Sequence, residues 1–270
     1  MTNMDLSNLT KEYILKMFSM GKRFDGRDLL DFRNIELVYD ISNKAEGSIS
    51  VKVGKTEVVV GVKLGIGEPY PDSPDKGNLM CTGELLPIAS PRYEFGPPGF
   101  KAIELGRLVD RAIRESGMIE FKKLVITPGE KVWTIYVDIY PLNDDGNLLD
   151  AATIATVLAL KNAKMPLLNE DGSIDYDKRK DSLPLSKETN PLSFSFFKLG
   201  DAIVLDPTRE EEEACDSRVT WGMSKWNGEY MINSCQKIGA EVFSGEEIEK
   251  MMEILPKKYE EMSRKIKSLH

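Results

Sequence analysis

The chain has 270 residues, of which 41% are hydrophobic and 30% charged, and its formal net charge is −8. This length is enough to bury a substantial core in one large domain or two smaller ones. An acidic chain is not expected to bind nucleic acid alone, because free-standing nucleic-acid binders usually have a basic surface. A local basic strip that acts beside more positive partner chains remains compatible with this composition.

The sequence contains no predicted membrane or secretion segment. No apolar run reaches the roughly 18 residues that a membrane-spanning helix needs, and residues 1–5 lack the basic and apolar regions of a signal peptide. We therefore expect a cytoplasmic protein without a membrane partner.

The cysteines and the histidine exclude several kinds of site. The three cysteines, Cys81, Cys215 and Cys235, are odd in number and include no Cys-x-x-Cys pair, so a disulfide framework or a thiolate metal site is not expected. The only histidine is His270. Serine–histidine and cysteine–histidine nucleophilic sites and most zinc sites are therefore excluded, and we expect no cofactor.

The first part of the chain alternates strand and helix patterns. Helical spacing of apolar residues predicts a helix over 6–18, with Gly21 as its natural stop. Two β-rich runs joined through Gly54 predict a hairpin. The predicted strands are 47–53, 56–64, 78–87, 122–127 and 131–140. The predicted helices are an amphipathic one over 101–116 and a buried one over 148–160, which is apolar nearly all round.

Residues 169–184 are polar and charged, and we interpret them as a connection between two halves, 1–184 and 185–270. After this connection a strand–glycine–strand pattern at 196–204 echoes the one at 50–58, which suggests an internal pseudo-repeat. Further strands are predicted at 218–223 and 230–234. Ser244 and Glu247 form a capping-box signature for a last helix, which Pro256 should kink or split.

Three arginines share one side of the predicted helix over 101–116. Arg107, Arg111 and Arg114 span only about 60° at 100° per residue, opposite the apolar face. Such a stripe is able to hold successive phosphates of a single nucleic-acid strand through bidentate hydrogen bonds. The plainer interpretation is a solvated face whose arginines are partly paired with nearby acidic residues, namely Glu104, Asp110 and Glu115.

Two acidic groups are candidate cation sites, each with a simpler explanation. The run from Glu210 to Glu213 is more typical of a solvated turn. Asp144, Asp145 and Asp150 lie at a loop-to-helix junction, where they are better explained as caps and partners of the helix dipole. Asp150 has the further alternative of pairing with a basic residue of a neighbouring chain.

The aromatic residues are less informative. Tyr93 and Phe95 lie in a Pro/Gly-rich loop over 91–99, where we prefer loop anchoring or a subunit contact to stacking on bases. Trp133 is expected in the core or in an interface. We assign no role to Trp221 and Trp226.

Residues 205–220 resemble the strand and turn of RNase PH-like phosphorolytic exoribonucleases. Active members of that family carry two acidic residues six apart in this run, and the second is usually an aspartate that acts as the general acid or positions it. Here the two positions are Glu212 and Arg218. A guanidinium stays protonated at ordinary pH, so Arg218 is unable to deliver or accept a proton.

A second departure from the family pattern lies upstream. The phosphate loop of the family, roughly Asp-Gly-Gly-Ser/Thr-Arg before a helix, holds the attacking phosphate. This chain instead has Asp144-Asp145-Gly146-Asn147-Leu148. Leu148 replaces the arginine and Asp145 adds a negative charge, so a phosphate dianion would meet repulsion. Both departures predict the fold of a phosphorolytic nuclease without its active site, and therefore a chain that is not itself an enzyme.

Other segments extend the resemblance from about Gly21 to the last helix. Residues 23–27 (RFDGR) resemble the opening of the superfamily, and residues 46–56 resemble its first hairpin. Residues 84–98 and 144–152 are similar to the non-catalytic RNase PH-like subunit of the archaeal exosome. The resemblance implies an α/β (α+β) RNase PH fold, like domain 2 of ribosomal protein S5, built from two pseudo-repeated βαβα halves.

The resemblance also implies partners and a role. It implies a hexameric ring in which three copies alternate with three copies of a catalytic RNase PH-like paralogue, beneath a cap of S1/KH-type RNA-binding subunits. Single-stranded RNA would enter the central channel for 3′-to-5′ phosphorolysis by the paralogue. Similar subunits bind RNA from the helix that carries Arg107 and Arg111, and Arg114 is the weakest candidate. The alternatives are an active exoribonuclease that uses a displaced acid such as Glu212 or Asp216, and a purely structural ring member.

Overall fold

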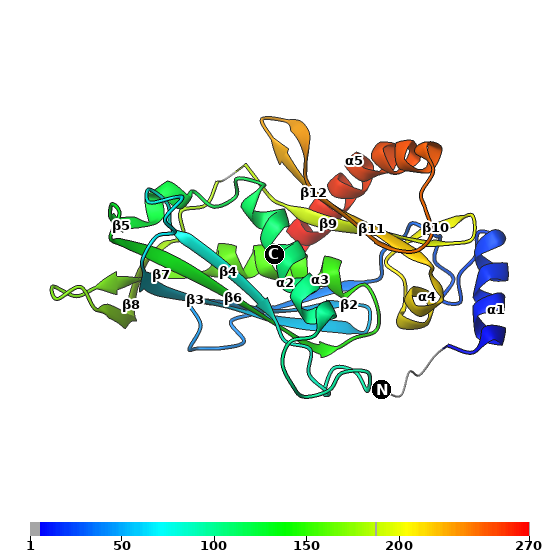
Figure 1. The fold of residues 1–270 in the computed structure, drawn as a ribbon, viewed down its shortest axis with the longest axis horizontal. Coiled ribbons are helices and arrows are strands. Elements are labelled where there is room, and N and C mark those ends of the chain that lie inside the picture. Colours follow the sequence, from blue (N-terminus) through cyan, green and yellow to red (C-terminus); the bar gives the residue numbers. More distant parts are fainter. Residues whose placement is uncertain (1–5, 187, 270) are drawn as a thin grey trace.

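The computed structural model describes residues 6–186 and 188–269 and contains two β-sheets with helices packed between them (Figure 1). The larger sheet has the strand order β1-β2-β3-β6-β4, with β5 paired to β6, and the smaller one has the order β10-β9-β11-β12. This arrangement confirms the predicted α/β class. Among the described residues, no helix is both long and apolar enough to span a bilayer.

The first part of the chain forms the larger sheet and its helices. Its elements are α1 (Asn8–Ser19), β1 (Ile35–Tyr39), β2 (Gly47–Val53), β3 (Thr56–Gly67), β4 (Asn78–Gly83), α2 (Phe100–Arg114), the 3-10 helix η1 (Phe121–Leu124), β5 (Val125–Thr127), β6 (Lys131–Asn143), α3 (Leu148–Asn162), β7 (Lys164–Leu168) and β8 (Ile174–Ser182). Buried and half-buried residues alternate along β3, because one face of the sheet is covered by α2 and α3.

The second part forms the smaller sheet. Its elements are β9 (Leu192–Leu199), β10 (Ala202–Leu205), α4 (Arg209–Ala214), β11 (Ser217–Trp226), β12 (Glu229–Gly239) and α5 (Gly245–Ser268). Strand β9 is buried along almost its whole length because both α3 and α5 contact it. The buried helix α3 therefore joins the two sheets into one core.

The suggested pseudo-repeat is present as two matching hairpins. Strands β2 and β3 are joined through Gly54, and strands β9 and β10 through Gly200. Both glycines have left-handed backbone angles, with φ of 61° and 58°. A residue with a Cβ is strained in this conformation, so glycine fits both turns.

Four sequence-based expectations need correction. Residues 169–184 are not a plain connection but lie mostly in the β7–β8 hairpin. The acidic run from Glu210 to Glu213 lies in helix α4 rather than in a solvated turn. The predicted strand at 122–127 begins as the 3-10 helix η1. Helix α5 has the predicted capping box of Ser244 and Glu247, but it is not split and continues through Pro256.

A buried ion network ties the N-terminal segment to the second sheet. The carboxylate of Asp206, which is fully buried, accepts hydrogen bonds from Arg33 Nε at 2.9 Å and Nη2 at 2.8 Å, and from Arg27 Nη1 at 3.1 Å. Nearby, Arg23 forms a buried ion pair with Glu211. The RFDGR segment at 23–27 therefore supplies structural cations that hold the β10–α4 turn.

Asp150 is a second buried link between the two parts. It lies in the first turn of α3 and is 1% exposed. Its carboxylate accepts hydrogen bonds from the backbone N–H of Ser195 at 3.0 Å and from the Ser195 hydroxyl at 2.8 Å. This burial excludes the alternative in which Asp150 pairs with a neighbouring chain.

We predict that Asp206→Ala strongly destabilises the fold. The substitution leaves the buried Arg33 guanidinium without its carboxylate, and such a loss costs about 3–5 kcal/mol of unfolding free energy. Urea denaturation of the purified chain measures this change. Asp75→Ala is the control, because the pair of Asp75 with Lys122 is exposed and long at 3.7 Å. Equal small effects of the two substitutions would contradict the structural role of Asp206.

We also predict a pH dependence of stability from Asp150. Burial raises its pKa to about 7, although hydrogen bonds from Ser195 favour the charged form. The folded state therefore binds the proton more tightly than the unfolded state, and the resulting stabilisation is complete below about pH 4 and lost as the pH rises to about 7. Asp150→Asn should gain stability relative to the wild type across this interval in denaturation at a series of pH values. A difference that does not change with pH, as expected for the exposed control Asp177→Asn, would contradict this prediction.

Candidate functional site: a pocket between the two sheets

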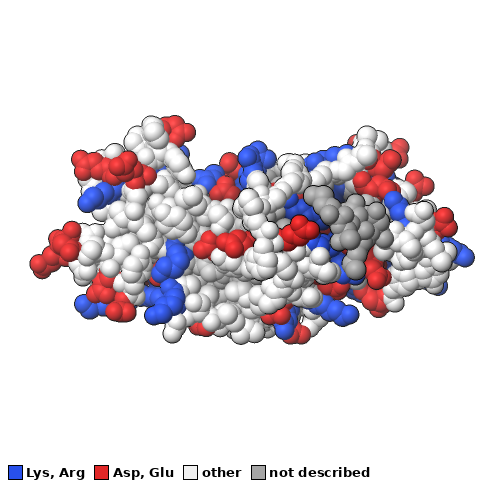
Figure 2. Space-filling model, turned by 60° about the horizontal axis from the view of Figure 1, so that its bottom comes forward, with Lys and Arg blue, Asp and Glu red and all other residues white. Residues whose placement is uncertain are grey.

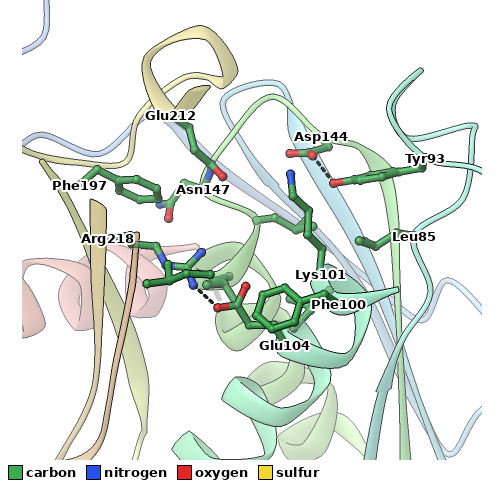
Figure 3. Close-up of a pocket in the computed structure, with 14 residues that line it drawn as sticks. Leu85, Tyr93, Phe100, Lys101, Glu104, Asp144, Asn147, Phe197, Glu212 and Arg218 are labelled. Carbon is green, nitrogen blue, oxygen red and sulfur yellow. Dashed lines mark hydrogen bonds and ion pairs between the residues drawn. The ribbon is translucent and has the colours of Figure 1, made fainter. Parts of the chain in front are cut away.

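A pocket of about 160 Å³ lies where α2, α3 and β11 meet (Figure 3). Its walls come from both parts of the chain. The lining residues are Leu85, Tyr93, Phe100, Lys101, Glu104, Leu105, Asp144, Asn147, Leu148, Leu149, Phe197, Glu212, Arg218 and Ile238. The structure thus brings together the four positions that the sequence analysis singled out as altered active-site positions, namely Glu212, Arg218, Asn147 and Leu148.

A carboxylate of the chain itself lies at the start of α3, beside this pocket. Asn147 precedes the helix in a left-handed conformation with φ of 54° and makes no side-chain capping bond. Its backbone N–H instead donates to Glu212 Oε2 at 2.7 Å, and its side-chain amide donates to Asp206 Oδ1 at 2.9 Å. A helix N-terminus favours negative charge, and Glu212 supplies a carboxylate beside it.

This contact corrects the expectation that Asp144 and Asp145 cap the helix. Asp144 Oδ1 accepts a 3.2 Å hydrogen bond from Gly146 within the loop. The carbonyl of Asp145 accepts from Arg33 Nη1 at 2.8 Å. Gly146 has a φ of 88°, and a Cβ at this position would lie 2.6 Å from the carbonyl oxygen of Pro207. The loop is therefore pressed against the β10–α4 turn that carries Glu212.

Arg218 is held by an ion pair inside the pocket. Its Nη2 lies 2.5 Å from Glu104 Oε1 of α2, and both side chains are mostly buried. A guanidinium paired in this way neutralises the charge of the carboxylate. The ion pair fastens α2 to β11.

A third group of contacts anchors the loop before α2. The Tyr93 hydroxyl donates to Asp144, and burial together with the charge of Asp144 raises the pKa of Tyr93. Arg92 bridges Asp144 at 3.0 Å and Glu213 at 2.6 Å. These contacts support the preferred interpretation of Tyr93 as an anchor, whereas Phe95 is exposed.

The charges around the pocket do not favour phosphate chemistry. Three carboxylates, Asp144, Glu212 and Glu104, face two cations, Arg218 and Lys101. Burial and the charge of Asp144 raise the pKa of Glu212. Among the described residues, no cluster of histidine, cysteine or acidic side chains has the arrangement of a metal site.

The three predicted RNA-binding arginines differ in their contacts. Arg107 and Arg111 are exposed, and neither side chain has an ion pair or hydrogen bond within residues 6–186 and 188–269. Arg114 instead pairs with Asp110 at 2.7 Å and donates to the carbonyl of Leu79 at 2.9 Å. Because Glu104 binds Arg218 and Asp110 binds Arg114, two of the three expected acidic partners are unavailable to Arg107 and Arg111.

One face of the molecule has no broad basic area. Figure 2 shows acidic and basic side chains that alternate on this face in small groups. A nucleic-acid contact on this face would therefore depend on a few cations.

Sequence reasoning missed several residues that shape the site. Glu104 was identified only as a neighbour of the arginines, and nothing local indicates that it pairs with Arg218, which is 114 positions away. Lys101 and Phe100 were likewise not singled out. The only local signal is that all three precede Leu105 at the end of a Pro/Gly-rich loop, where a helix begins.

Comparison with known proteins identifies the family. Residues 31–166 match the 3′ exoribonuclease family, domain 1, and residues 189–254 match domain 2 of the same family. The chain belongs to the 3′ exoribonuclease family. Within this family it is 41% identical to the "Exosome complex component Rrp42" of Thermococcus onnurineus, over 97% of this chain and 95% of that protein. The protein of the same name from Thermoplasma acidophilum is 48% identical over 80% of each chain.

Solved structures of the 3′ exoribonuclease family have the same fold. A chain of the Archaeoglobus fulgidus exosome with RNA bound to the active site is 39% identical, with a TM-score of 0.84 over 93% of this chain and 98% of that chain. A chain of an archaeal exosome core is 37% identical, with a TM-score of 0.79 over 92% of each.

We predict that this family member has lost the phosphate site. A ligand at 100 times its dissociation constant stabilises a protein by about 2.7 kcal/mol, so a working site would raise the melting temperature. Glu212 accepts a hydrogen bond from the Asn147 N–H directly before α3, and its charge repels phosphate. Inorganic phosphate should therefore stabilise the chain no more than chloride does at equal ionic strength. A phosphate-specific increase of several degrees in a thermal melt would contradict this.

Proposed function

We propose that this chain is a non-catalytic ring subunit of the archaeal exosome, and that it holds single-stranded RNA for phosphorolysis by a catalytic RNase PH-like partner. The observation that carries the loss of catalysis is the Glu212 contact with the Asn147 N–H at 2.7 Å. A carboxylate of the chain takes the place of the attacking phosphate, and Arg218 is unable to act as the acid.

Assembly with the partner follows from the similarity to exosome components. The ring would alternate three copies of this chain with three of the catalytic paralogue, and S1/KH-type subunits would cap one face. The two parts of the chain, 1–184 and 185–270, would act as one unit within each subunit. Residues Asp206 and Asp150 support this, because they hold the two sheets together. The site of RNA turnover would be the cytoplasm.

The RNA contact is assigned to Arg107 and Arg111 on α2. Both guanidiniums are exposed and lack acidic partners within the described chain. They lie one helical turn apart, about 6 Å along the axis at 1.5 Å per residue. Phosphate contacts position a strand without identifying its sequence, which suits a complex that degrades RNA of any sequence. Arg114 is left out of this contact because Asp110 and Leu79 hold it.

The test is charge reversal in the assembled ring. Arg111→Glu removes one phosphate contact and adds repulsion, so we expect about tenfold weaker RNA binding at 0.1 M salt, a salt slope reduced by about 1, and slower processive trimming. Lys122→Glu is the matched control, because Lys122 is 78% exposed on η1 and its change in charge is the same.

Three outcomes separate the alternatives. Selective loss of binding and trimming in Arg111→Glu, with assembly unchanged by native mass, supports the proposal. Unchanged trimming by Arg111→Glu favours the purely structural ring member. Equal loss in Arg111→Glu and Lys122→Glu would show a general effect of net charge and would contradict the assignment to α2.

A further inference from the structure

The exposed stripe of α2 continues beyond the two arginines as an apolar surface. Phe100 and Ile103, in the first turn of the helix, are 68% and 52% exposed. At 100° per residue, Phe100, Ile103, Arg107 and Arg111 fall within a stripe about 80° wide. One face of one helix thus presents two apolar side chains, followed by two guanidiniums that have no ion pair or hydrogen bond with the described part of the chain.

This exposed pair is not explained by the packing of α2. The buried face of the helix is already filled by other residues, namely Ala102, Leu105, Gly106, Leu108, Val109, Ala112 and Ile113. Gly106 lets the helix approach β4 so closely that a Cβ there would lie 2.8 Å from the carbonyl oxygen of Cys81. The helix is therefore firmly seated, and Phe100 and Ile103 remain on its outer side. Phe100 also forms one edge of the pocket (Figure 3).

We propose that Phe100, supported by Ile103, is a stacking platform for bases of the RNA strand whose phosphates Arg107 and Arg111 hold. This inference rests on the proposed function and adds a base-contacting site to it. Single-stranded nucleic acids are commonly bound by cations along the backbone together with aromatic rings on which the bases stack. Every base has a π-face, so such a platform is compatible with RNA of any sequence.

The dimensions of the stripe fit a strand that lies along the helix. Arg107 is seven positions after Phe100, which is about 10 Å along the axis, and Arg111 lies about 6 Å further on. A strand held by two adjacent phosphates therefore brings a neighbouring base within reach of the Phe100 ring. A protein partner is the rival occupant, but two guanidiniums that have no partner among the described residues favour an anionic ligand.

The experiment uses the ring assembled with the catalytic partner and two single-stranded probes of equal length. One probe is an ordinary oligoribonucleotide, and the other is an abasic ribose-phosphate chain. Phe100→Ala should bind the ordinary RNA about tenfold more weakly and bind the abasic chain as the wild type does. Phe100→Trp should keep the wild-type affinity for both. Trp226→Ala is the control and should change the affinity for neither probe. Trp226 is an exposed aromatic residue at the opposite end of β11 from Arg218.

The outcomes distinguish this inference from the proposed function. If Arg111→Glu weakens binding of both probes while Phe100→Ala weakens neither, the platform is refuted and the RNA-holding role stands. If neither variant changes binding, both are refuted. Loss of the ring in Phe100→Ala, seen as a change in native mass, would identify an apolar subunit contact and overturn the platform. Equal weakening of both probes by Phe100→Ala would also overturn it, because stacking requires bases.

Discussion

The contact between Glu212 and the backbone N–H of Asn147, directly before α3, is the interaction on which the proposed loss of phosphate binding depends. Glu212 belongs to α4 and Asn147 to the loop before α3, so the 2.7 Å hydrogen bond joins the two parts of the chain. Asp206 reinforces the same junction through the Asn147 side chain and Arg33. A carboxylate placed this close to a helix N-terminus repels an external phosphate.

Charged residues of the pocket are held by other groups of the same chain. Arg218 pairs with Glu104, Glu212 binds the Asn147 N–H, and Asp144 contacts Tyr93 and Arg92. Arg107 and Arg111, on the outer face of α2, have no such partner within the described residues. The proposed function accordingly assigns RNA binding to the outer face of α2, while the paired charges of the pocket join the two parts of the chain.

The helices and hairpins that have a clear local sequence pattern were predictable from the sequence. The hairpins around Gly54 and Gly200, the helices over 100–114 and 148–162 and the Ser244 capping box all follow from local patterns. The β7–β8 hairpin was missed because residues 169–184 show no apolar alternation. The run from Glu210 to Glu213 was misjudged because a cluster of charges usually indicates solvent, whereas Glu211 is buried against Arg23, 188 positions away.

The site was predictable in its residue types but not in its contacts. The departures at Asn147, Leu148, Glu212 and Arg218 are visible in the chain, and the structure brings them together in one pocket. The pairing of Arg218 with Glu104 depends on the packing of α2 against the second sheet, which no local pattern encodes. Arg114, by contrast, is held by Asp110 of its own helix and by the carbonyl of Leu79 on β4.

The central claim is that this chain holds RNA without cutting it. The most direct measurement uses rings in which the catalytic partner has lost its general acid by substitution, while this chain is wild type, incubated with RNA and inorganic phosphate. The account predicts that RNA still binds and that no nucleoside diphosphate is released. Sustained release of diphosphates from such rings would show that this chain performs phosphorolysis itself, and would contradict the account.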